Sequence, residues 1–267
     1  MLLAIDSSAG ASAAVVHEGH VLASWRTAET NTHAEVLASA VQRTLEEAGG
    51  RGPQLDGVVV GVGPGPFTGL RVGLALAHSL AEVWQKPLHG ICSLDSLALR
   101  AAHHGIRGEF LAASDARRRE VYWARYRVGQ SSEERTAEEG SPRLIDGPHV
   151  SSADAAPAQA AVGAGVGLYP EQLHLPPGFP DDAAHWLPDA AELGLLAEPH
   201  AASSPADPQA AWALPGGMED PQWADSATKR PHNGSGAIPD LVLREPLPLY
   251  LRESDAKVPQ QMKRAEQ

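Results

Sequence analysis

The chain has 267 residues, a formal net charge of −12 and a single cysteine, Cys92. Because chains beyond about 250 residues tend to split into more than one unit, this length predicts two lobes. One cysteine excludes a disulfide framework and a metal site built from several cysteines. The acidic balance argues against this chain being the main surface that grips a nucleic acid, since phosphate neutralisation needs clustered Lys and Arg.

No apolar run in the sequence approaches the roughly 20 residues that cross a bilayer. The apolar start at residues 1–5 has no basic flank and meets Asp6 at once, so it indicates a first strand and not a signal peptide. We therefore expect a soluble cytoplasmic protein that makes no membrane contact.

The chain opens with three predicted strands, at residues 2–6, 12–17 and 21–26. Asp6 and Ser7 occupy the first tight turn, with a second serine after them. A carboxylate followed by hydroxyls on such a turn could bind a metal–nucleotide phosphate. The alternative is that these side chains satisfy the backbone of the turn, as Asp and Ser usually do.

A helix follows at about residues 32–48, with a capping box at Thr32 and Glu35 and a stop at two glycines. His33 lies in its first turn. The helix carries one apolar stripe. The stripe consists of Val36, Leu37, Ala40, Val41, Thr44, Leu45 and Ala48.

The most informative segment is a strand at residues 58–60, a glycine loop at 61–69 and a helix at about 68–85. A strand that ends in glycines and restarts as a helix aims backbone N–H groups at one point, as in phosphate sites. The loop lacks the lysine of a Walker motif, and its Gly-x-Gly-x-x-x-Gly spacing misses the dinucleotide fingerprint by one residue.

The helix at 68–85 is apolar almost all round, so it must be covered on more than one side. Gly69, Gly73 and Ala77 form a strip of small residues that lets another helix approach closely. Packing inside this chain and a contact with another subunit are both open readings of this strip.

The second half echoes the first. A strand at 87–92 and a helix from Ser93 to about residue 104 lead to strands at 109–115 and 120–128. Asp115 ends a strand before a tight turn, as Asp6 does, which suggests a duplicated lobe. A second strand-to-glycine transition at 161–167 and a helix at 183–198 follow. Residues 199–240 are rich in Pro, Ala, Ser, Asp and Gly, which predicts a disordered or loosely draped insertion.

Four blocks in order resemble the TsaB/YeaZ family: residues 3–8 (LAIDSS), 63–73 (GPGPFTGLRVG), 115–117 with 120–124 (DAR, EVYWA) and 248–252 (PLYLR). The resemblance implies an α/β protein with the actin-like ATPase (ASKHA) fold, in which two duplicated lobes each hold a mixed sheet with flanking helices. Residues 1–105 would form the N-terminal lobe, with the glycine loop and partner-binding helices. Residues 106–267 would form the C-terminal lobe, with the insertion.

The same resemblance implies vestigial nucleotide loops and no cofactor. The loop residues are Asp6, Ser7, Gly63, Gly65, Thr68, Gly69 and Asp115. Pro66 stands where the family usually has serine, which removes a hydroxyl and a backbone donor from the loop.

Comparison with the related catalytic protein TsaD indicates that no metal site is present. TsaD places two metal-binding histidines four residues apart, at positions that correspond to Ser93 and Leu97 here. Neither side chain can replace an imidazole, since leucine has no donor atom. His103 and His104 are adjacent on the same predicted helix and point to different faces. The resemblance therefore implies a non-catalytic chain.

We expect a heterodimer with a TsaD-like catalytic subunit, joined by a TsaE-like ATPase, with tRNA reached only through the complex. A homodimer is the alternative when the partner is absent. The supported chemistry would be transfer of threonylcarbamoyl from threonylcarbamoyl-adenylate to the adenosine next to the anticodon. The predicted interface consists of His33, Leu37, Val41, Gly69, Val72, Gly73, Leu76, Ala77 and Leu80.

Two other classes of function compete with this one. A stand-alone actin-fold ATPase or small-molecule kinase would act through Asp6, Asp115 and the glycine loops, and nucleotide turnover by the isolated chain would reveal it. A metallopeptidase is the weaker alternative, because it needs a pair of metal ligands that the sequence does not offer.

Overall fold

The structure of the chain is a computed structural model, and it describes residues 1–27, 33–129, 140–157, 159–201 and 243–251. The predicted insertion at 199–240 lies outside the described residues from residue 202 onward. Within the described part, no helix is long and apolar enough to cross a membrane.

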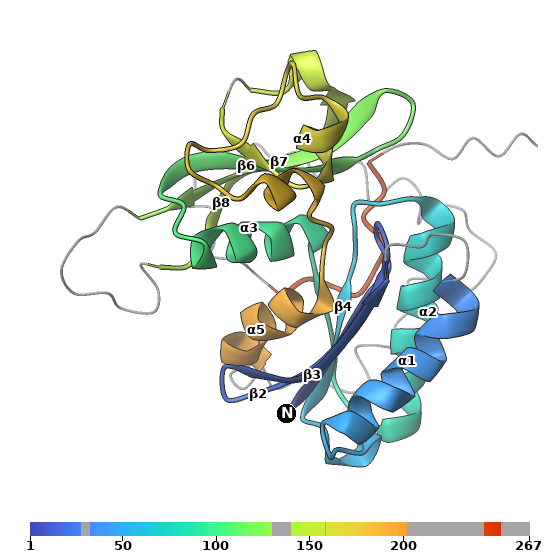
Figure 1. Ribbon diagram of the computed structural model, residues 1–267. Coiled ribbons are helices and arrows are strands. Elements are labelled where there is room, and N and C mark those ends of the chain that lie inside the picture. The colour runs from blue at the N-terminus through green and yellow to red at the C-terminus, as the bar shows by residue number, and fades with distance from the viewer. Residues whose placement is uncertain (28–32, 130–139, 158, 202–242, 252–267) are drawn as a thin grey trace, which may run out of the picture.

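The first sheet has the strand order β3-β2-β1-β4-β5 (Figure 1). Strands β1 and β2 pair antiparallel, as do β2 and β3, whereas β4 runs parallel to both β1 and β5. The strands are β1 (Leu2–Asp6), β2 (Ala11–His17), β3 (His20–Thr27), β4 (Gly57–Gly61) and β5 (Leu88–Ile91).

The second sheet repeats this plan, with the order β8-β7-β6-β9. Two antiparallel pairs are again followed by a parallel one, between β6 and β9. Its strands are β6 (Gly108–Asp115), β7 (Glu120–Val128), β8 (Arg143–Ser152) and β9 (Ala161–Val162). The predicted fold of two duplicated lobes with mixed sheets is confirmed.

The sequence echo between Asp6 and Asp115 also has a structural counterpart. Each aspartate is the last residue of the first strand of its sheet. Asp6 Oδ1 accepts the N–H of Ser8 at 2.9 Å, and Asp115 Oδ1 accepts the N–H of Arg117 at 2.7 Å. The two turns therefore use the same hydrogen bond from residue i+2, as Asp does in an Asx turn.

Helices cover both faces of the first sheet (Figure 1). Helices α1 (His33–Glu47) and α2 (Phe67–Trp84) lie on one face, and α5 (Ala190–Ala201) lies on the other. Successive residues of a strand point to opposite faces. Accordingly, Leu3 of β1 packs in the cluster beneath α1 and α2, while Ala4 packs in the cluster beneath α5.

The second sheet is also covered on both faces. Helix α3 (Ser93–His103) packs on the face that carries Phe110 and Tyr126, and α4 (Ala164–Leu168) packs on the face that carries Leu111 and Trp123. The two sheets meet in the sequence between β5 and β6, near residue 105, but their helices do not divide there. Helix α3 precedes it and packs on the second sheet, whereas α5 follows it and packs on the first.

The prediction of one helix at 183–198 is wrong. The segment forms a 3-10 turn at Asp181–His185 and, after a break at Pro188, the helix α5. A proline disfavours the helical conformation in the residue before it, so the apolar pattern could not continue as one helix. Two further 3-10 turns lie at Gly52–Gln54 and Ala153–Ala155.

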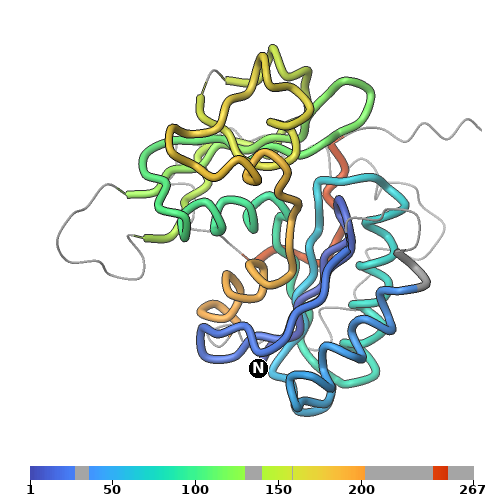
Figure 2. The backbone as a smooth tube through the Cα atoms, viewed as in Figure 1, coloured from blue at the N-terminus to red at the C-terminus, as the bar shows by residue number. Residues whose placement is uncertain are grey.

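Residues 243–251 form an extended strap that returns to the first sheet, drawn in red in Figure 2. Arg244 and Gly90 exchange backbone hydrogen bonds of 2.7 and 2.9 Å at the free edge of β5. Leu249 donates its N–H to the carbonyl of Val62 in the glycine loop at 2.8 Å. The strap therefore attaches to the segment that leads into α2.

Candidate functional site

Asp6 is the centre of the candidate site, and its side chain is enclosed by other parts of the chain. The residue is only 1% exposed. Ser8 donates its N–H and its hydroxyl to Oδ1 at 2.9 and 2.7 Å, and the Ser93 hydroxyl donates to Oδ2 at 2.6 Å. Burial raises the pKa of Asp6, and these hydrogen bonds from Ser93 and Ser8 oppose the rise.

The glycine loop packs against this turn. Gly63 donates its N–H to the Ser93 hydroxyl at 3.1 Å, and Ser93 returns its own N–H to the Gly63 carbonyl at 2.8 Å. A Cβ at Gly65 would overlap the carbonyl oxygen of Ser8. These glycines therefore permit close contact between two loops of the chain itself.

Ser7 reaches the following helix. Its hydroxyl donates to the carbonyl of Gly69 at 2.7 Å and accepts the N–H of Gly73 at 3.1 Å. A Cβ at Gly73 would overlap this hydroxyl oxygen. The turn after β1 is thus joined to α2 as well as to α3.

The structure gathers five of the seven predicted loop residues: Asp6, Ser7, Gly63, Gly65 and Gly69. The other two lie elsewhere. Thr68 is exposed in the first turn of α2. Asp115 belongs to the second sheet, where it contacts the backbone N–H and, at 3.1 Å, the guanidinium of Arg117.

Ser93 is the residue whose role sequence reasoning missed. The sequence predicts it at the start of a helix and at the position of a lost metal ligand, and Ser93 is the first residue of α3, after the N-cap residue Cys92. Its hydroxyl instead joins Asp6 to the glycine loop. Its alignment with a metal-ligand position of the catalytic relative was the one feature of the sequence that could have pointed to this residue.

Two groups beside this site are unsuited to a metal ion or already engaged by the chain itself. Leu97 has no donor atom for a metal, and it is buried in the apolar cluster beneath the second sheet. The N–H of Gly63 is already engaged by Ser93. Across the described part of the chain, no group of three or more His, Cys, Asp or Glu side chains is arranged to hold a metal ion.

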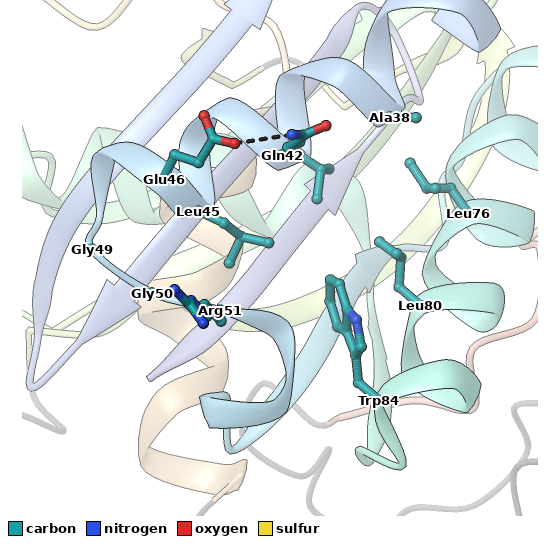
Figure 3. A pocket seen from close by; sticks show the side chains of 11 residues that line it. Ala38, Gln42, Leu45, Glu46, Gly49, Gly50, Arg51, Leu76, Leu80 and Trp84 are labelled. Atoms are coloured by element: carbon teal, nitrogen blue, oxygen red, sulfur yellow. Dashed lines mark hydrogen bonds between the residues drawn. The ribbon is translucent and has the colours of Figure 1, made fainter.

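A groove lies between α1 and α2 on the outer side of the first lobe, with a volume of about 690 Å³. Figure 3 shows Leu45 of α1 facing Leu76, Leu80 and Trp84 of α2 across it. Gln42 and Glu46, joined by a hydrogen bond of 2.9 Å, add a polar border. The groove is therefore an apolar surface with polar side chains beside it.

The predicted interface needs correction at three positions. Leu37, Gly73 and Ala77 are buried in the chain's own fold, so a partner cannot reach them in this structure. For the strip of small residues, internal packing explains Gly73 and Ala77, because Gly73 faces Ser7 and Ala77 belongs to the core beneath α2.

The other predicted interface residues differ in exposure. Val72, Leu76 and Leu80 are partly exposed on α2, and Val41 is buried but lines the groove. Gly69 is half-buried beside Ser7. His33 begins α1, and its side chain lies outside the description.

Comparison with known proteins gives consistent matches. The family model described as "TsaD: tRNA N6-adenosine threonylcarbamoyltransferase" matches residues 26–141. The structure titled "YeaZ from Pseudomonas aeruginosa" has a TM-score of 0.62 and 32% identity, over 76% of this chain and 92% of that one. A second Pseudomonas aeruginosa structure, titled as an uncharacterized protein with similarity to peptidase YEAZ, has a TM-score of 0.64 and 30% identity, over 94% and 99% of the two chains.

Among curated relatives, the tRNA threonylcarbamoyladenosine biosynthesis protein TsaB of Escherichia coli is 35% identical over 126 residues. The match covers 47% of this chain and 54% of that protein. The chain spans about half the length of the curated relatives it matches, or less.

Proposed function

The chain belongs to the TsaB/YeaZ family, and we propose that it is a non-catalytic cytoplasmic subunit that binds a TsaD-like catalytic protein. The pair would attach threonylcarbamoyl to the tRNA adenosine next to the anticodon. One observation carries the non-catalytic role: the chain's own side chains fill the site around Asp6.

The chemistry of that site supports the assignment of catalysis to the partner. A general base or phosphate ligand must come within hydrogen-bond reach of its substrate. Asp6 is almost fully buried, and both of its carboxylate oxygens accept hydrogen bonds from the chain's own serines. Its role here is to hold the first turn, the glycine loop and α3 together.

The groove between α1 and α2 supports the partner role. Interfaces commonly combine an apolar centre with a polar rim and are rich in aromatic residues. Leu76, Leu80 and Trp84 supply the apolar centre, and Gln42 and Glu46 lie at its border. A homodimer formed in the absence of the partner would use the same groove. The TsaE-like ATPase would join the heterodimer, and the partner would supply most contacts with tRNA.

The test is a pair of variants on α2. Leu80 lines the groove, whereas Val83, on the same helix, is 76% exposed and does not line it. We expect Leu80→Arg to weaken binding to a TsaD-like protein at least tenfold, about 1.4 kcal/mol, because it buries a charge in the apolar interface. Val83→Arg should change the affinity little. Calorimetric titration measures both.

Thermal unfolding of both variants shows that any loss of binding comes from a folded chain. Equal affinities for the Leu80→Arg chain and the unmodified chain would contradict the proposed interface. If no TsaD-like protein binds the unmodified chain, the proposed function itself fails.

A further inference from the structure

We propose that Ser7 is a positioning residue that fixes the path of helix α2 from inside the fold. The hydroxyl of Ser7 lies between two backbone groups of that helix, the carbonyl of Gly69 and the N–H of Gly73. The consequence for partner binding rests on the proposed function, because α2 forms one wall of the groove. The effect of Ser7 on α2 itself does not depend on the proposed function.

The two contacted groups lie one helical turn apart. In an α-helix, the N–H of a residue donates to the carbonyl four positions earlier, and Gly69 and Gly73 have this spacing. Ser7 Oγ is 2.7 Å from the Gly69 carbonyl oxygen and 3.1 Å from the Gly73 nitrogen. The Ser7 hydroxyl therefore contacts both members of one backbone pair of the helix, which ties this turn of α2 to the turn after β1.

The sequence of α2 accommodates this contact. A Cβ at position 73 would overlap Ser7 Oγ, and it would lie 3.2 Å from Ser7 Cβ. Glycine is a poor helix former, second only to proline. Its presence inside α2 is therefore explained by the space that the Ser7 hydroxyl occupies.

The position of Ser7 is supported by hydrogen bonds to its neighbour in the chain, Asp6. The preceding residue, Asp6, accepts hydrogen bonds from the backbone N–H of Ser8 and from the Ser93 hydroxyl of α3, and neither depends on the Ser8 hydroxyl. Further along α2 from Gly73, Leu76 and Leu80 line the groove. Asp6 and its chain neighbour Ser7 thus bond to α3 and to α2 respectively, so the turn after β1 lies between α3 and the helix that carries the groove.

Ser7→Ala tests the proposal, with Ser8→Ala as its matched control. Both serines are buried, at 1% and 2% exposure, and both lie in the same turn. The Ser8 hydroxyl donates to Asp6, whereas the Ser7 hydroxyl contacts α2. Hydrogen exchange of the free chain measures the N–H of Gly73, and amides of β4 in the same variant report any global loss of stability.

We expect the Gly73 amide to exchange roughly fivefold to tenfold faster in Ser7→Ala, relative to β4, in line with the loss of one hydrogen bond. The Ser8→Ala chain should retain the ratio of the unmodified chain. Equal ratios in the two variants would overturn the positioning role.

A second measurement uses Gly73→Ala in two backgrounds. In the unmodified chain the new Cβ overlaps Ser7 Oγ, so the thermal midpoint should fall. In the Ser7→Ala background the hydroxyl is gone and the nearest remaining side-chain atom of residue 7 is Cβ, at 3.2 Å, so the same substitution should cost little or raise the midpoint. Equal falls in both backgrounds would show that the hydroxyl does not restrict position 73, and would overturn the proposal.

The affinity for a TsaD-like protein then tests the consequence for the interface. We expect Ser7→Ala to weaken binding severalfold and Ser8→Ala to leave it nearly unchanged. Altered exchange with unchanged affinity would overturn the link from Ser7 to the groove. Failure of the unmodified chain to bind would count against the proposed function alone, since the exchange experiment needs no partner.

Discussion

Asp95 shows how burial changes the behaviour of a single residue. It lies in the first turn of α3, where its Oδ1 accepts the hydroxyl of Tyr126 at 2.6 Å. Burial raises the pKa of Asp95 to about 6, and the Tyr126 hydrogen bond and the charge of Arg244 oppose the rise. The folded chain therefore holds this proton at a pH where the unfolded chain has released it.

This difference gives a pH prediction with a definite sign. Between pH 3.8, the ordinary pKa, and about 6, the folded state binds more protons at Asp95, so stability falls as the pH rises through this window. The full effect is at most about 3 kcal/mol. Asp95→Asn, which cannot ionise, should gain stability relative to the unmodified chain between pH 4 and pH 7.

Urea unfolding of both chains at the two pH values measures the change. Burial also raises the pKa of Asp6 and of Glu192, the latter to about 7, so other groups contribute to the pH dependence of each chain. The difference between the two chains cancels these contributions and isolates Asp95. A difference that does not vary with pH would show that Asp95 ionises in the folded chain as it does in the unfolded one.

Single residues of the candidate site were predictable where their chemistry is local. The Asp-Ser-Ser turn and the glycines follow from short sequence patterns. The hydrogen bond from Ser93 to Asp6 does not follow from such a pattern, because the two residues lie 87 positions apart. The strip on α2 was ambiguous for the same reason, since small residues at helical spacing do not reveal what they face.

At the scale of the elements, the pattern of apolar residues predicted most strands and helices close to their observed bounds. Strand β8 (Arg143–Ser152) was not predicted, and the exception near residue 190 has a local cause. Asp189 caps α5 by accepting the N–H of Ala191 at 2.9 Å, and Ser12 accepts the N–H of Ala190 at 2.9 Å. The second contact joins α5 to β2, and a contact of this range cannot be read from helical periodicity.

The strap at residues 243–251 gives a prediction at the same scale. Leu249 packs against the core clusters of both sheets, and the Tyr250 ring lies tilted against Phe67 with ring centroids 4.4 Å apart. Leu249→Ala should lower the free energy of unfolding by about 1 to 3 kcal/mol, below the range for fully buried leucines because this side chain is partly exposed.

Leu247→Ala is the matched control, because Leu247 lies in the same strap and is 50% exposed. It should change stability by less than about 0.5 kcal/mol, as surface substitutions usually do. Chemical denaturation measures both variants. Equal effects would mean that the strap does not dock through Leu249.

At the scale of the whole molecule, the two sheets share one strand plan but are not independent units. Helix α3 precedes residue 105 in the sequence but packs on the second sheet, whereas α5 follows it but packs on the first. The strap contacts the cores of both sheets. The duplication was predictable from the echo of Asp6 in Asp115. The exchange of helices was not, because the pattern of a helix shows how much of it is buried and not against which sheet.

The last prediction concerns the activity of the isolated chain. An actin-like fold with a glycine loop suggests ATP hydrolysis, but Ser93 engages the Gly63 N–H and Pro66 supplies no N–H at all. We therefore expect the purified chain to bind neither zinc nor iron tightly, and to release phosphate from ATP far more slowly than about 1 per second, within the typical enzyme range. Elemental analysis and a phosphate-release assay measure the two properties.

Asp6→Asn is the control, because it removes the carboxylate that an ATPase of this fold would use and leaves a side chain of the same shape. Stoichiometric metal, or rapid turnover that Asp6→Asn abolishes, would refute the non-catalytic role, whereas turnover that persists in Asp6→Asn would come from a contaminating enzyme.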